Sequence, residues 1–435
     1  MHNIFAPITA TIRSSSIIIR ISGNNLDEFF SYFALKKNLI PRKSYVIDLK
    51  KSGQAIDQVL LTFFKSPNSY TGEDVIEISH HGSQIIYEKI INELAKIPNF
   101  RFANPGEFTK RAFLNNKIDL LQAEAIDSLI KAKTGNESQI ALKQLYGENS
   151  KYFNKIRDDL VHMRAYFEAY IDFPEDDLDP AAFEEARKNL ANIITEINER
   201  INKDKNIPKL IESGIKIAII GPSNAGKSSL INSLAKKEVA IVTNIAGTTR
   251  DALEVNIDLA GFQVSLIDTA GFRETSNEIE QIGINKAKEK IATSDLIILM
   301  IPADNLDEYD NYAYLEQGKL IKIINKIDLK KANADWADLQ ISLKEQIGID
   351  KLLSYLEKKI KEKYNIEENH YITNQRQHKL CEELARELEK INLDAELVII
   401  AEHLRRASDI IGRITGLIDI EEILDKLFSS FCIGK

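Results

Sequence analysis

The stretch Gly221-Pro-Ser-Asn-Ala-Gly-Lys227-Ser228 is the strongest indication of how the central part of this chain folds. It follows the apolar, strand-like run 215–220 and precedes a helix-like run that begins at Ser229. A glycine-rich loop between a strand and a helix is the P-loop pattern, in which backbone N–H groups surround phosphate oxygens. Its glycines allow the close backbone approach that such a loop requires. The sequence therefore predicts a phosphate-binding loop rather than an ordinary glycine-rich turn.

Three more short motifs follow in order. They are Gly247-Thr-Thr-Arg250, Asp268-Thr-Ala-Gly271 and Asn325-Lys326-Ile327-Asp328. From Ile215 strand-like and helix-like runs alternate, which predicts a doubly wound, mostly parallel sheet with its ligand site at the carboxyl ends of the strands. One motif alone could arise by chance, whereas four in this order predict a GTP-binding domain.

Each motif supplies a different part of the nucleotide site. Lys227 places a positive charge against the β- and γ-phosphates, and the Ser228 hydroxyl is placed to ligate magnesium. We expect Asp268 to hold magnesium through water and the Gly271 N–H to contact the γ-phosphate. Thr249, between the P-loop and Asp268, would complete the magnesium shell when GTP is bound.

Guanine recognition is expected further along the chain. Asp328 can accept two hydrogen bonds from the guanine edge that adenine cannot donate. Ser342-Leu343-Lys344 is the candidate loop behind the base, although alanine is more usual in its middle. The whole predicted GTP-binding set is Asn224, Ala225, Gly226, Lys227, Ser228, Ser229, Thr243, Asn244, Ile245, Ala246, Gly247, Thr248, Thr249, Asp268, Thr269, Ala270, Gly271, Asn325, Lys326, Asp328, Ser342, Leu343 and Lys344.

The group that orients the attacking water is not evident. Ras-like GTPases carry a glutamine directly after the third motif, and this chain has Phe272 there. An apolar side chain cannot orient water, so another residue must do so. The residues alone leave five candidates open, each of which could also be a solvated loop charge: Arg250, Arg273, Glu274, Glu278 and Glu280.

Composition sets broad limits on the class of protein. The 435 residues, 44% of them hydrophobic, allow about three domains. No apolar run approaches ~18 residues and no signal-peptide pattern is present, so we expect a cytoplasmic protein without membrane spans. Cys381 and Cys432 give no disulfide framework. The net charge of -8 argues against a broad basic surface that grips nucleic acid, but allows a local one.

Changes of periodicity divide the chain into four segments. Residues 1–117 mix strand-like and helix-like runs and predict an α+β domain. Residues 118–210 and 371–435 are helical, and 211–370 is the α/β segment. Because neither helical segment looks long enough to bury its apolar faces alone, we expect one helical bundle with the G domain inserted into it. The expected strands are 17–21, 59–64 and 74–79, and the expected helices are 83–95, 122–133, 138–170, one from Pro180, 377–392, 396–410 and 421–430.

Four blocks outside the G domain point to a known family. They are Ser69-Tyr-Thr-Gly-Glu-Asp-Val-Ile-Glu77 with His80-His-Gly82, Asn104-Pro-Gly-Glu-Phe-Thr-Lys-Arg-Ala-Phe-Leu114 running into Lys117-Ile-Asp-Leu120, Ile171-Asp-Phe-Pro-Glu175, and Phe431-Cys-Ile-Gly-Lys435. With these blocks the chain resembles the MnmE (TrmE) tRNA-modification GTPases over essentially its whole length. The resemblance implies a multidomain α/β plus α protein with a folate-binding domain, a helical domain and an inserted Ras-like G domain.

The resemblance also implies a role for the N-terminal domain. In such proteins this domain forms the homodimer and binds 5-formyl-tetrahydrofolate or a related folate. The matching positions are Arg20, Glu77, Lys117 and Lys435. Arginine and lysine suit the carboxylates of the folate glutamate, and Glu77 suits the N–H edge of the pterin. Without the resemblance each of these charges would be read as part of a surface salt bridge.

In the family, potassium activates GTP hydrolysis when two G domains meet. The cation takes the place of an arginine finger in neutralising charge in the transition state. Asn224 matches its side-chain ligand, and Thr243, Ile245 and Thr248 match the surrounding loop. Glu280 matches the glutamate that positions water.

The implied reaction is a tRNA modification. With the FAD-dependent flavoprotein MnmG (GidA), the family adds an aminomethyl- or carboxymethylaminomethyl-type group to carbon 5 of the wobble uridine. A folate supplies the one-carbon unit. Cys432 matches a cysteine needed for modification beside the folate pocket, although a lone cysteine near a helix end is more often a small buried hydrophobe.

Two other functions are compatible with the sequence. A GTP-dependent binding switch, such as a ribosome-assembly GTPase, could share the G domain but would not need Cys432 or the folate block. A scaffold that has lost folate binding is also possible, because the segment 7–16 replaces the glycine-rich loop that is usual in the family. The tRNA surface is not readable, since four basic residues could equally be structural charges: Lys110, Arg111, Arg405 and Arg406.

Overall fold

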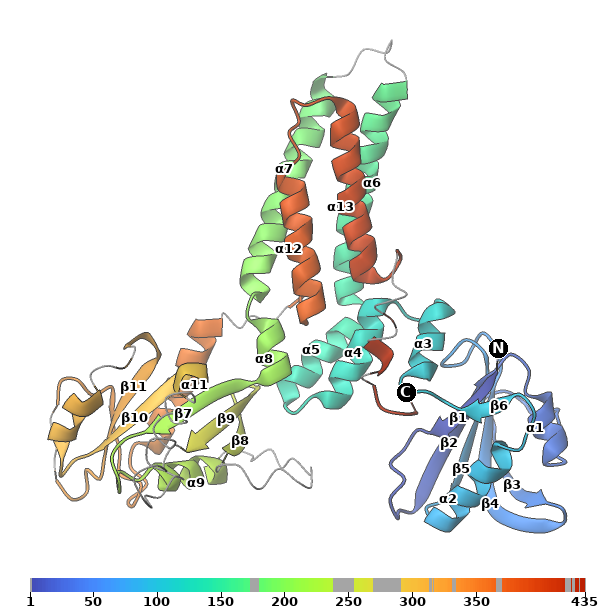
Figure 1. Cartoon of the computed structure of the whole chain (residues 1–435), viewed down its shortest axis with the longest axis horizontal. Coiled ribbons are helices and arrows are strands. Elements are labelled where there is room, and N and C mark those ends of the chain that lie inside the picture. The colour runs from blue at the N-terminus through green and yellow to red at the C-terminus, as the bar shows by residue number, and fades with distance from the viewer. Residues whose placement is uncertain are drawn as a thin grey trace, which may run out of the picture. The chain divides into compact units, whose positions relative to one another are not determined.

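A computed structural model shows the arrangement of the chain (Figure 1). It describes residues 2–172, 180–237, 254–268, 291–312, 315, 317–330, 334–364, 370–418, 424, 427–429 and 431–434. The chain divides into two compact units. The first comprises residues 1–127, 144–178 and 390–435, and the second comprises residues 128–143 and 179–389.

The first unit contains a six-stranded sheet in the order β3-β4-β5-β2-β1-β6. All neighbouring strands are antiparallel except β1 and β6, which are parallel. The three strands expected from the sequence are confirmed within β2, β4 and β5. The strand bounds are β1 Asn3–Pro7, β2 Ser16–Gly23, β3 Ser44–Lys51, β4 Gln54–Phe64, β5 Asp74–His81 and β6 Phe100–Phe102.

The two faces of this sheet differ. Alternate residues of a strand point to opposite faces, and on β2 the residues Ile19 and Ile21 enter a core that the helices α1 (Asp27–Tyr32) and α2 (Gln84–Leu94) cover. Arg20, between them, lies on the other face, against Phe108 of α3 (Glu107–Leu114). The α3 side of the sheet is therefore the face that carries polar and charged side chains.

The helices that follow differ from the expectation in one place. A single helix over 138–170 was expected, and this is wrong: α5 (Gly135–Leu145) and α6 (Glu148–Asp172) are separate. Gly147 between them has φ +84°, a left-handed conformation that interrupts a helix. The apolar periodicity continues across this break, so the pattern alone could not reveal it.

Within the first unit, α6 lies beside α13 (Leu397–Thr415) (Figure 1). The expected helix 396–410 is confirmed, and α13 runs one turn further to Gly416, which has φ +89°. Phe428 and Phe431 of the C-terminal segment pack with Phe113 and with Leu120 at the start of α4 (Leu120–Lys131). The expected helix 421–430 lies largely outside the described residues.

The second unit contains the G domain. Its sheet has the order β12-β11-β10-β7-β9-β8, and only the β8–β9 pair is antiparallel. The expected doubly wound, mostly parallel sheet is thus confirmed. The strand bounds are β7 Ile215–Ile220, β8 Glu254–Leu259, β9 Phe262–Asp268, β10 Leu296–Pro302, β11 Leu320–Asn325 and β12 Leu339–Gln340.

Both faces of this sheet are buried, as is usual for parallel strands. On β10, Ile298 and Met300 enter the core beneath the helices α8, α9 and α11. Ile297, Leu299 and Ile301 enter a second cluster on the opposite face. The helix bounds are α8 Ile207–Ser213, α9 Lys227–Lys237 and α11 Ile349–Tyr364.

The G domain interrupts a helical arrangement within this unit. Helix α12 (Gln375–Glu389) follows the G domain in the chain but packs against α7 (Pro180–Asp204) and α8, which precede it. Asp204, the last residue of α7, links the chain segments on either side of the G domain. Its carboxylate accepts hydrogen bonds from the backbone N–H groups of Tyr371 and Ile372, which precede α12. The G domain is therefore inserted between helices that pack together.

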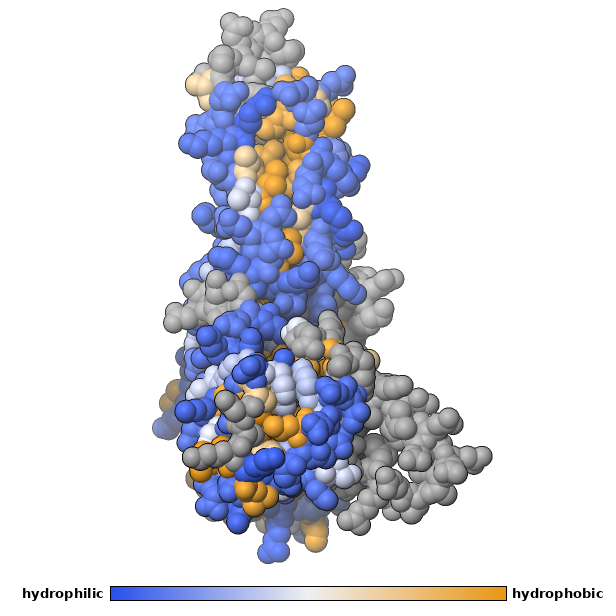
Figure 2. Space-filling view, turned by 90° about the vertical axis from the view of Figure 1, so that its left-hand side faces the viewer, coloured by the Kyte–Doolittle hydropathy of each residue, from blue (hydrophilic) through white to orange (hydrophobic). Residues whose placement is uncertain are grey.

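No helix in the ranges given above is both long and apolar enough to cross a lipid bilayer. Figure 2 shows that hydrophilic residues cover most of the visible face, with a narrow hydrophobic stripe along the helices.

Candidate functional site

The P-loop connects β7 to α9 at the carboxyl edge of the parallel sheet. Two of its glycines have backbone angles that other residues rarely adopt, φ +144° at Gly221 and φ +100° at Gly226. A Cβ atom at Gly221 would lie 2.2 Å from the Met300 carbonyl oxygen, and one at Gly226 would lie 2.6 Å from the Asn325 side-chain nitrogen. Only glycine fits these positions, so the loop backbone can approach a phosphate closely.

Lys227, the first residue of α9, folds back over this loop. Its ammonium group donates hydrogen bonds to the carbonyl oxygens of Gly221 (2.7 Å) and Pro222 (2.8 Å). Burial lowers the pKa of Lys227, and the nearby Asp268 carboxylate opposes that shift. The lysine charge is thus held at the mouth of the loop, where the sequence predicts phosphates.

Ser228 and Asp268 form the candidate magnesium site. Asp268 ends β9 and is 1% exposed. The Ser228 hydroxyl donates a 2.6 Å hydrogen bond to its carboxylate. An oxygen pair of this kind, beside the P-loop, matches the hard oxygen ligands that magnesium prefers.

Asn325 connects the phosphate end of the site to the base end. Its side-chain amide donates to the Ala225 carbonyl (2.8 Å), and its side-chain oxygen accepts from the Leu343 backbone N–H (3.3 Å). Since Asn325 is only 2% exposed, its role is to hold the P-loop and the base loop together.

Asp328 lies beside the predicted base loop. The Ser342 hydroxyl, which is fully buried, donates a 2.5 Å hydrogen bond to its carboxylate. This hydrogen bond keeps the pKa of Asp328 below its usual value, with smaller contributions from Lys344 and Lys326. The carboxylate is exposed, so it can accept hydrogen bonds from a base that stacks against this loop.

The structure thus brings the P-loop, Asp268, Asn325, Asp328 and the 342–344 loop together at one edge of the sheet, as the sequence predicts for a guanine-nucleotide site. The remaining predicted site residues lie outside the described residues: Thr243, Asn244, Ile245, Ala246, Gly247, Thr248, Thr249, Thr269, Ala270, Gly271, Glu280 and Lys435.

The first unit brings together two of the predicted folate residues. Arg20 and Glu77 are register partners on β2 and β5, and the Arg20 guanidinium donates to the Glu77 carboxylate at 2.9 Å through Nε. A second nitrogen of Arg20 lies 2.9 Å from the same oxygen. The exposed Lys117 donates to the Pro67 carbonyl at 2.9 Å.

Cys432 is exposed, which does not fit a small buried hydrophobe. Its carbonyl oxygen accepts a 3.4 Å hydrogen bond from the N–H of Gly106, the residue before α3. The neighbouring Phe431 is buried and anchors the segment. Cys381 of α12 is the opposite case, because burial raises its thiol pKa to about 12.

The buried charges of the first unit were not evident from the sequence. Arg111 forms an ion pair with Glu73 at 2.9 Å, with the two side chains 6% and 4% exposed. Glu73 also accepts a hydrogen bond from Ser22. Arg111 is therefore a structural charge. For this residue the structure answers the question, left open by the sequence, of whether it belongs to a tRNA surface or stabilises the fold. Arg405 and Arg406 pair with Glu402 on their own helix.

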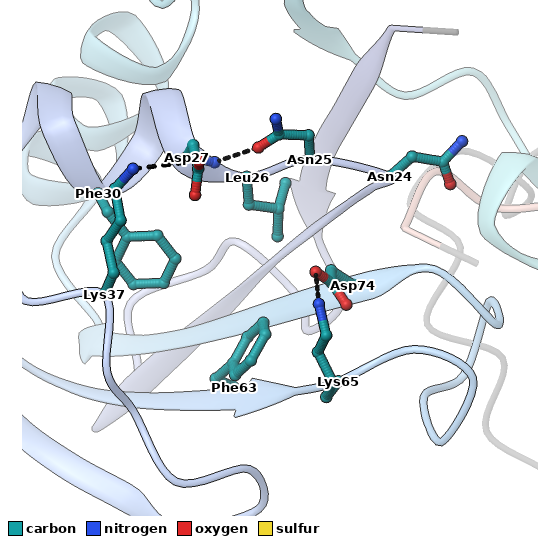
Figure 3. Close-up of a pocket in the computed structure, with 9 residues that line it drawn as sticks. All are labelled: Asn24, Asn25, Leu26, Asp27, Phe30, Lys37, Phe63, Lys65 and Asp74. Atoms are coloured by element: carbon teal, nitrogen blue, oxygen red, sulfur yellow. Dashed lines mark hydrogen bonds and ion pairs between the residues drawn. The ribbon is translucent and has the colours of Figure 1, made fainter.

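A cavity of about 440 Å³ opens elsewhere in the first unit (Figure 3). Two ion pairs flank it, Lys65 with Asp74 at 2.8 Å and Lys37 with Asp27 at 3.1 Å. Its apolar wall belongs to the core on the α1 and α2 side of the sheet, so it lies on the face opposite to Arg20. The lining residues are Asn24, Asn25, Leu26, Asp27, Phe30, Lys37, Phe63, Lys65 and Asp74.

Comparisons with known proteins agree with this arrangement. The family model described as the MnmE helical domain matches residues 120–432, and the model described as the GTP-binding protein TrmE N-terminus matches residues 3–117. Two curated relatives, both called tRNA modification GTPase MnmE, are from Rickettsia canadensis and Rickettsia prowazekii. Each is 40% identical over 446 residues and covers 100% of both chains.

Among solved structures, the FeoB G-domain from Methanococcus jannaschii is 25% identical and matches 34% of this chain and 98% of its own, with a TM-score of 0.26. The assignment rests on the full-length relatives and on the two family models, which together span nearly all of the sequence. The chain belongs to the MnmE (TrmE) family of tRNA-modification GTPases, which are GTP-hydrolysing enzymes.

Proposed function

We propose that this protein is a potassium-dependent GTPase that modifies carbon 5 of the wobble uridine of tRNA. It acts as a homodimer with an FAD-dependent MnmG-type flavoprotein, and a folate supplies the one-carbon unit. The product is of the aminomethyl or carboxymethylaminomethyl type. GTP hydrolysis drives opening and closing of the G domains, because the phosphate site holds no group suited to uridine chemistry.

The observation that carries this proposal is that Cys432 and Arg20 each contact a residue at the start of α3. The N–H of Gly106 binds the carbonyl of Cys432. Two residues further on, the ring of Phe108 lies 5.6 Å from the Arg20 guanidinium. Cys432 and Arg20 therefore contact residues only two positions apart at the start of α3, although they come from opposite ends of the chain. A pure GTP-dependent binding switch has no need of an exposed thiol at this place.

The residues at this place suit a folate chemically. The Arg20 guanidinium and the Lys117 ammonium are matched to the carboxylates of the folate glutamate, and Glu77 is matched to the N–H edge of the pterin. Their side chains remain accessible, at 15% for Arg20 and 26% for Glu77. Lys435 joins this set as a proposed contact. The bound folate supplies a one-carbon unit, and Cys432 supplies a thiol beside it.

At the nucleotide site, Lys227 neutralises phosphate charge while Ser228, Thr249 and Asp268 hold magnesium. Asn224, at φ +63° in the P-loop, is the proposed potassium ligand, together with Thr243, Ile245 and Thr248. Glu280 positions the attacking water. Asp328 selects guanine.

The proposed domains are 1–117 for folate binding and dimerisation, 118–210 and 371–435 for the helical part, and 211–370 for the G domain. The two free cysteines fit the reducing cytoplasm.

The proposal is tested in two steps. GTP turnover by the purified protein is measured in potassium and in sodium at equal ionic strength, and we expect strong stimulation by potassium and loss of turnover in Glu280→Ala with GTP binding retained. Equal, slow rates in both salts would favour a binding switch. Modification of tRNA is then measured with the flavoprotein, with and without 5-formyltetrahydrofolate. We expect Cys432→Ser to keep GTP turnover and lose modification.

A further inference from the structure

We infer that Tyr70 is a positioning residue of the folate site, which holds the plane of the Arg20 guanidinium and so sets where an anionic ligand group can dock. The inference rests on the proposed function. Tyr70 lies in the 65–73 segment between β4 and β5.

The first step is the environment of Arg20. Its guanidinium carbon lies 4.6 Å from the centre of the Tyr70 ring and 5.6 Å from that of Phe108. Both distances lie within the range in which a cation is attracted to the face of an aromatic ring. One edge of the guanidinium is turned to Glu77. Two aromatic rings and one carboxylate thus restrict the orientation of a side chain that is otherwise flexible.

The second step is what this orientation leaves available. A guanidinium has five N–H donors, and both nitrogens that contact Glu77 reach the same oxygen. Among the described residues, Glu77 is the only hydrogen-bond partner of the Arg20 side chain. The remaining donors lie in the plane of the guanidinium, whose carbon lies over the Tyr70 ring. A carboxylate accepts two parallel N–H bonds only from a guanidinium held in the right plane.

The third step is that Tyr70 is itself held firmly. Its hydroxyl shares a 2.8 Å hydrogen bond with the hydroxyl of Thr109 on α3, which is fully buried. Next to it, the Ser69 hydroxyl donates a 2.5 Å hydrogen bond to the Glu73 carbonyl. The Thr71 hydroxyl shares a 2.7 Å hydrogen bond with that of Ser22. The ring is therefore fixed from both its hydroxyl end and its backbone.

The same segment also holds the second cation. The Lys117 ammonium donates to the Pro67 carbonyl, and the side chain of the nearby Asn115 donates to the Thr71 carbonyl at 2.7 Å. Residues 65–73 thus contact both cations that are proposed to bind folate carboxylates. This is why Tyr70, and not only the charged residues, governs folate affinity.

The experiment measures binding of 5-formyltetrahydrofolate to the full-length chain by calorimetry. Tyr70→Phe keeps the ring, so its affinity should stay within about threefold of wild type. Tyr70→Leu removes the ring and should weaken binding by about 5- to 30-fold, the range that a cation–ring contact supplies. The matched control is Tyr45→Leu: this tyrosine also faces a lysine but lies on β3, and its replacement should leave folate affinity unchanged.

A double-mutant cycle separates positioning from a general structural role. In an Arg20→Gln background, Tyr70→Leu should have little further effect, because the guanidinium that it positions is gone. Equal effects of Tyr70→Leu in both backgrounds would overturn the inference. So would unchanged affinity in Tyr70→Leu while wild type binds folate. If wild type itself binds no folate, the proposed function fails instead.

Thermal melting shows whether each variant is folded. Should Tyr70→Leu be unfolded, phenylalanine and pentafluorophenylalanine at position 70 provide the second comparison. The two rings have nearly the same shape, but fluorination reverses the charge distribution of the ring face. Weaker folate binding by the fluorinated variant supports positioning through the ring face, and equal binding contradicts it.

Discussion

The two sheets of this protein present their chemistry in different ways. In the parallel sheet of the G domain, side chains of the nucleotide site follow the carboxyl ends of β7, β9 and β11. In the antiparallel sheet, Arg20 and Glu77 lie in the middle of β2 and β5 and project from the sheet face. A parallel sheet collects its loops at one edge, whereas an antiparallel sheet offers a face.

This difference decides what a sequence pattern can reveal. The residues of a loop at a strand end are consecutive in the sequence, so the nucleotide site can be recognised from four short motifs. Residues on a sheet face alternate with core residues and meet partners from distant strands; Arg20 and Glu77 are 57 positions apart. If the nucleotide site and the folate site are independent, a substitution in one should leave ligand binding at the other unchanged.

The largest effect is expected at the phosphate loop. Lys227→Ala removes the charge at the mouth of the P-loop, and GTP turnover should fall at least about 1,000-fold. Folate affinity should stay within twofold, because Arg20 and Glu77 belong to another sheet. Lys237→Ala, on the same helix but paired with the exposed Asp350, is the control with unchanged turnover. Loss of folate binding in Lys227→Ala would show that the two regions are coupled.

The next largest effect is expected in the reactivity of the two cysteine thiols, Cys381 and Cys432. Because the pKa of Cys381 is raised to about 12, at pH 8 it carries about 1,000-fold less thiolate than an ordinary cysteine. Labelling with a disulfide reagent at pH 8 should therefore modify one thiol rapidly and the second only on unfolding. Cys432→Ser should remove the rapid phase, and Cys381→Ser should keep it. Equal rates for both thiols would contradict the burial of α12.

The same shift gives a pH dependence of stability. The pKa of Cys381 in the folded protein lies above the unfolded value of about 8.5. The contribution of the buried, protonated thiol to the free energy of unfolding is therefore complete below about pH 8.5. It is lost as the pH rises from about 8.5 towards about 12. The difference in unfolding free energy between wild type and Cys381→Ser should therefore shrink over this window, and a constant difference would contradict the shift.

The next effect concerns the stability of the first unit. Arg111→Leu leaves the Glu73 carboxylate buried without its ion-pair partner and should lower the free energy of unfolding by about 3 kcal/mol or more. Hydrogen exchange of the β2 and β5 amides measures this locally. The control is Lys96→Leu, which breaks a pair whose lysine is 61% exposed and should cost less than about 1 kcal/mol. Equal costs for the two variants would remove the special role of the buried pair.

A smaller effect is expected for the residue that selects the base, Asp328. Asp328→Asn replaces the acceptor of the guanine N–H groups, so GTP affinity should fall about 100-fold. Affinity for xanthosine triphosphate should rise, because xanthine carries a carbonyl where guanine has its amino group and asparagine can donate to it. Binding of fluorescent analogues of both nucleotides measures this exchange. Unchanged GTP affinity would remove Asp328 from the base site.

The smallest effect is expected at Ser342. Its hydroxyl lowers the pKa of Asp328, so Ser342→Ala should let that pKa rise towards its usual value of about 3.9. The carboxylate must be ionised to accept from guanine, and GTP affinity should therefore begin to fall at a higher pH in the variant as the solution is acidified. Identical pH profiles would show that Ser342 only shapes the loop.

Much of the fold follows from local patterns. Alternating apolar residues predicted β2, β4 and β5, and the repeated strand–helix rhythm predicted the parallel sheet. The break at Gly147 was missed because helical periodicity continues through it, and only its left-handed backbone separates α5 from α6. Helix α13 runs one turn past its expected end, to Gly416, whose left-handed φ of +89° ends it.

The four motifs were enough to predict the nucleotide site, since the backbone shape of each motif depends mainly on its own residues. The family resemblance named the folate residues and Cys432, but not their setting. Only the folded structure shows that Arg111 is a buried structural charge, that Cys432 is exposed next to α3, and that Tyr70 faces Arg20. Such contacts join residues far apart in the chain, and the free energy that fixes them comes from packing of the whole unit rather than from local backbone preference.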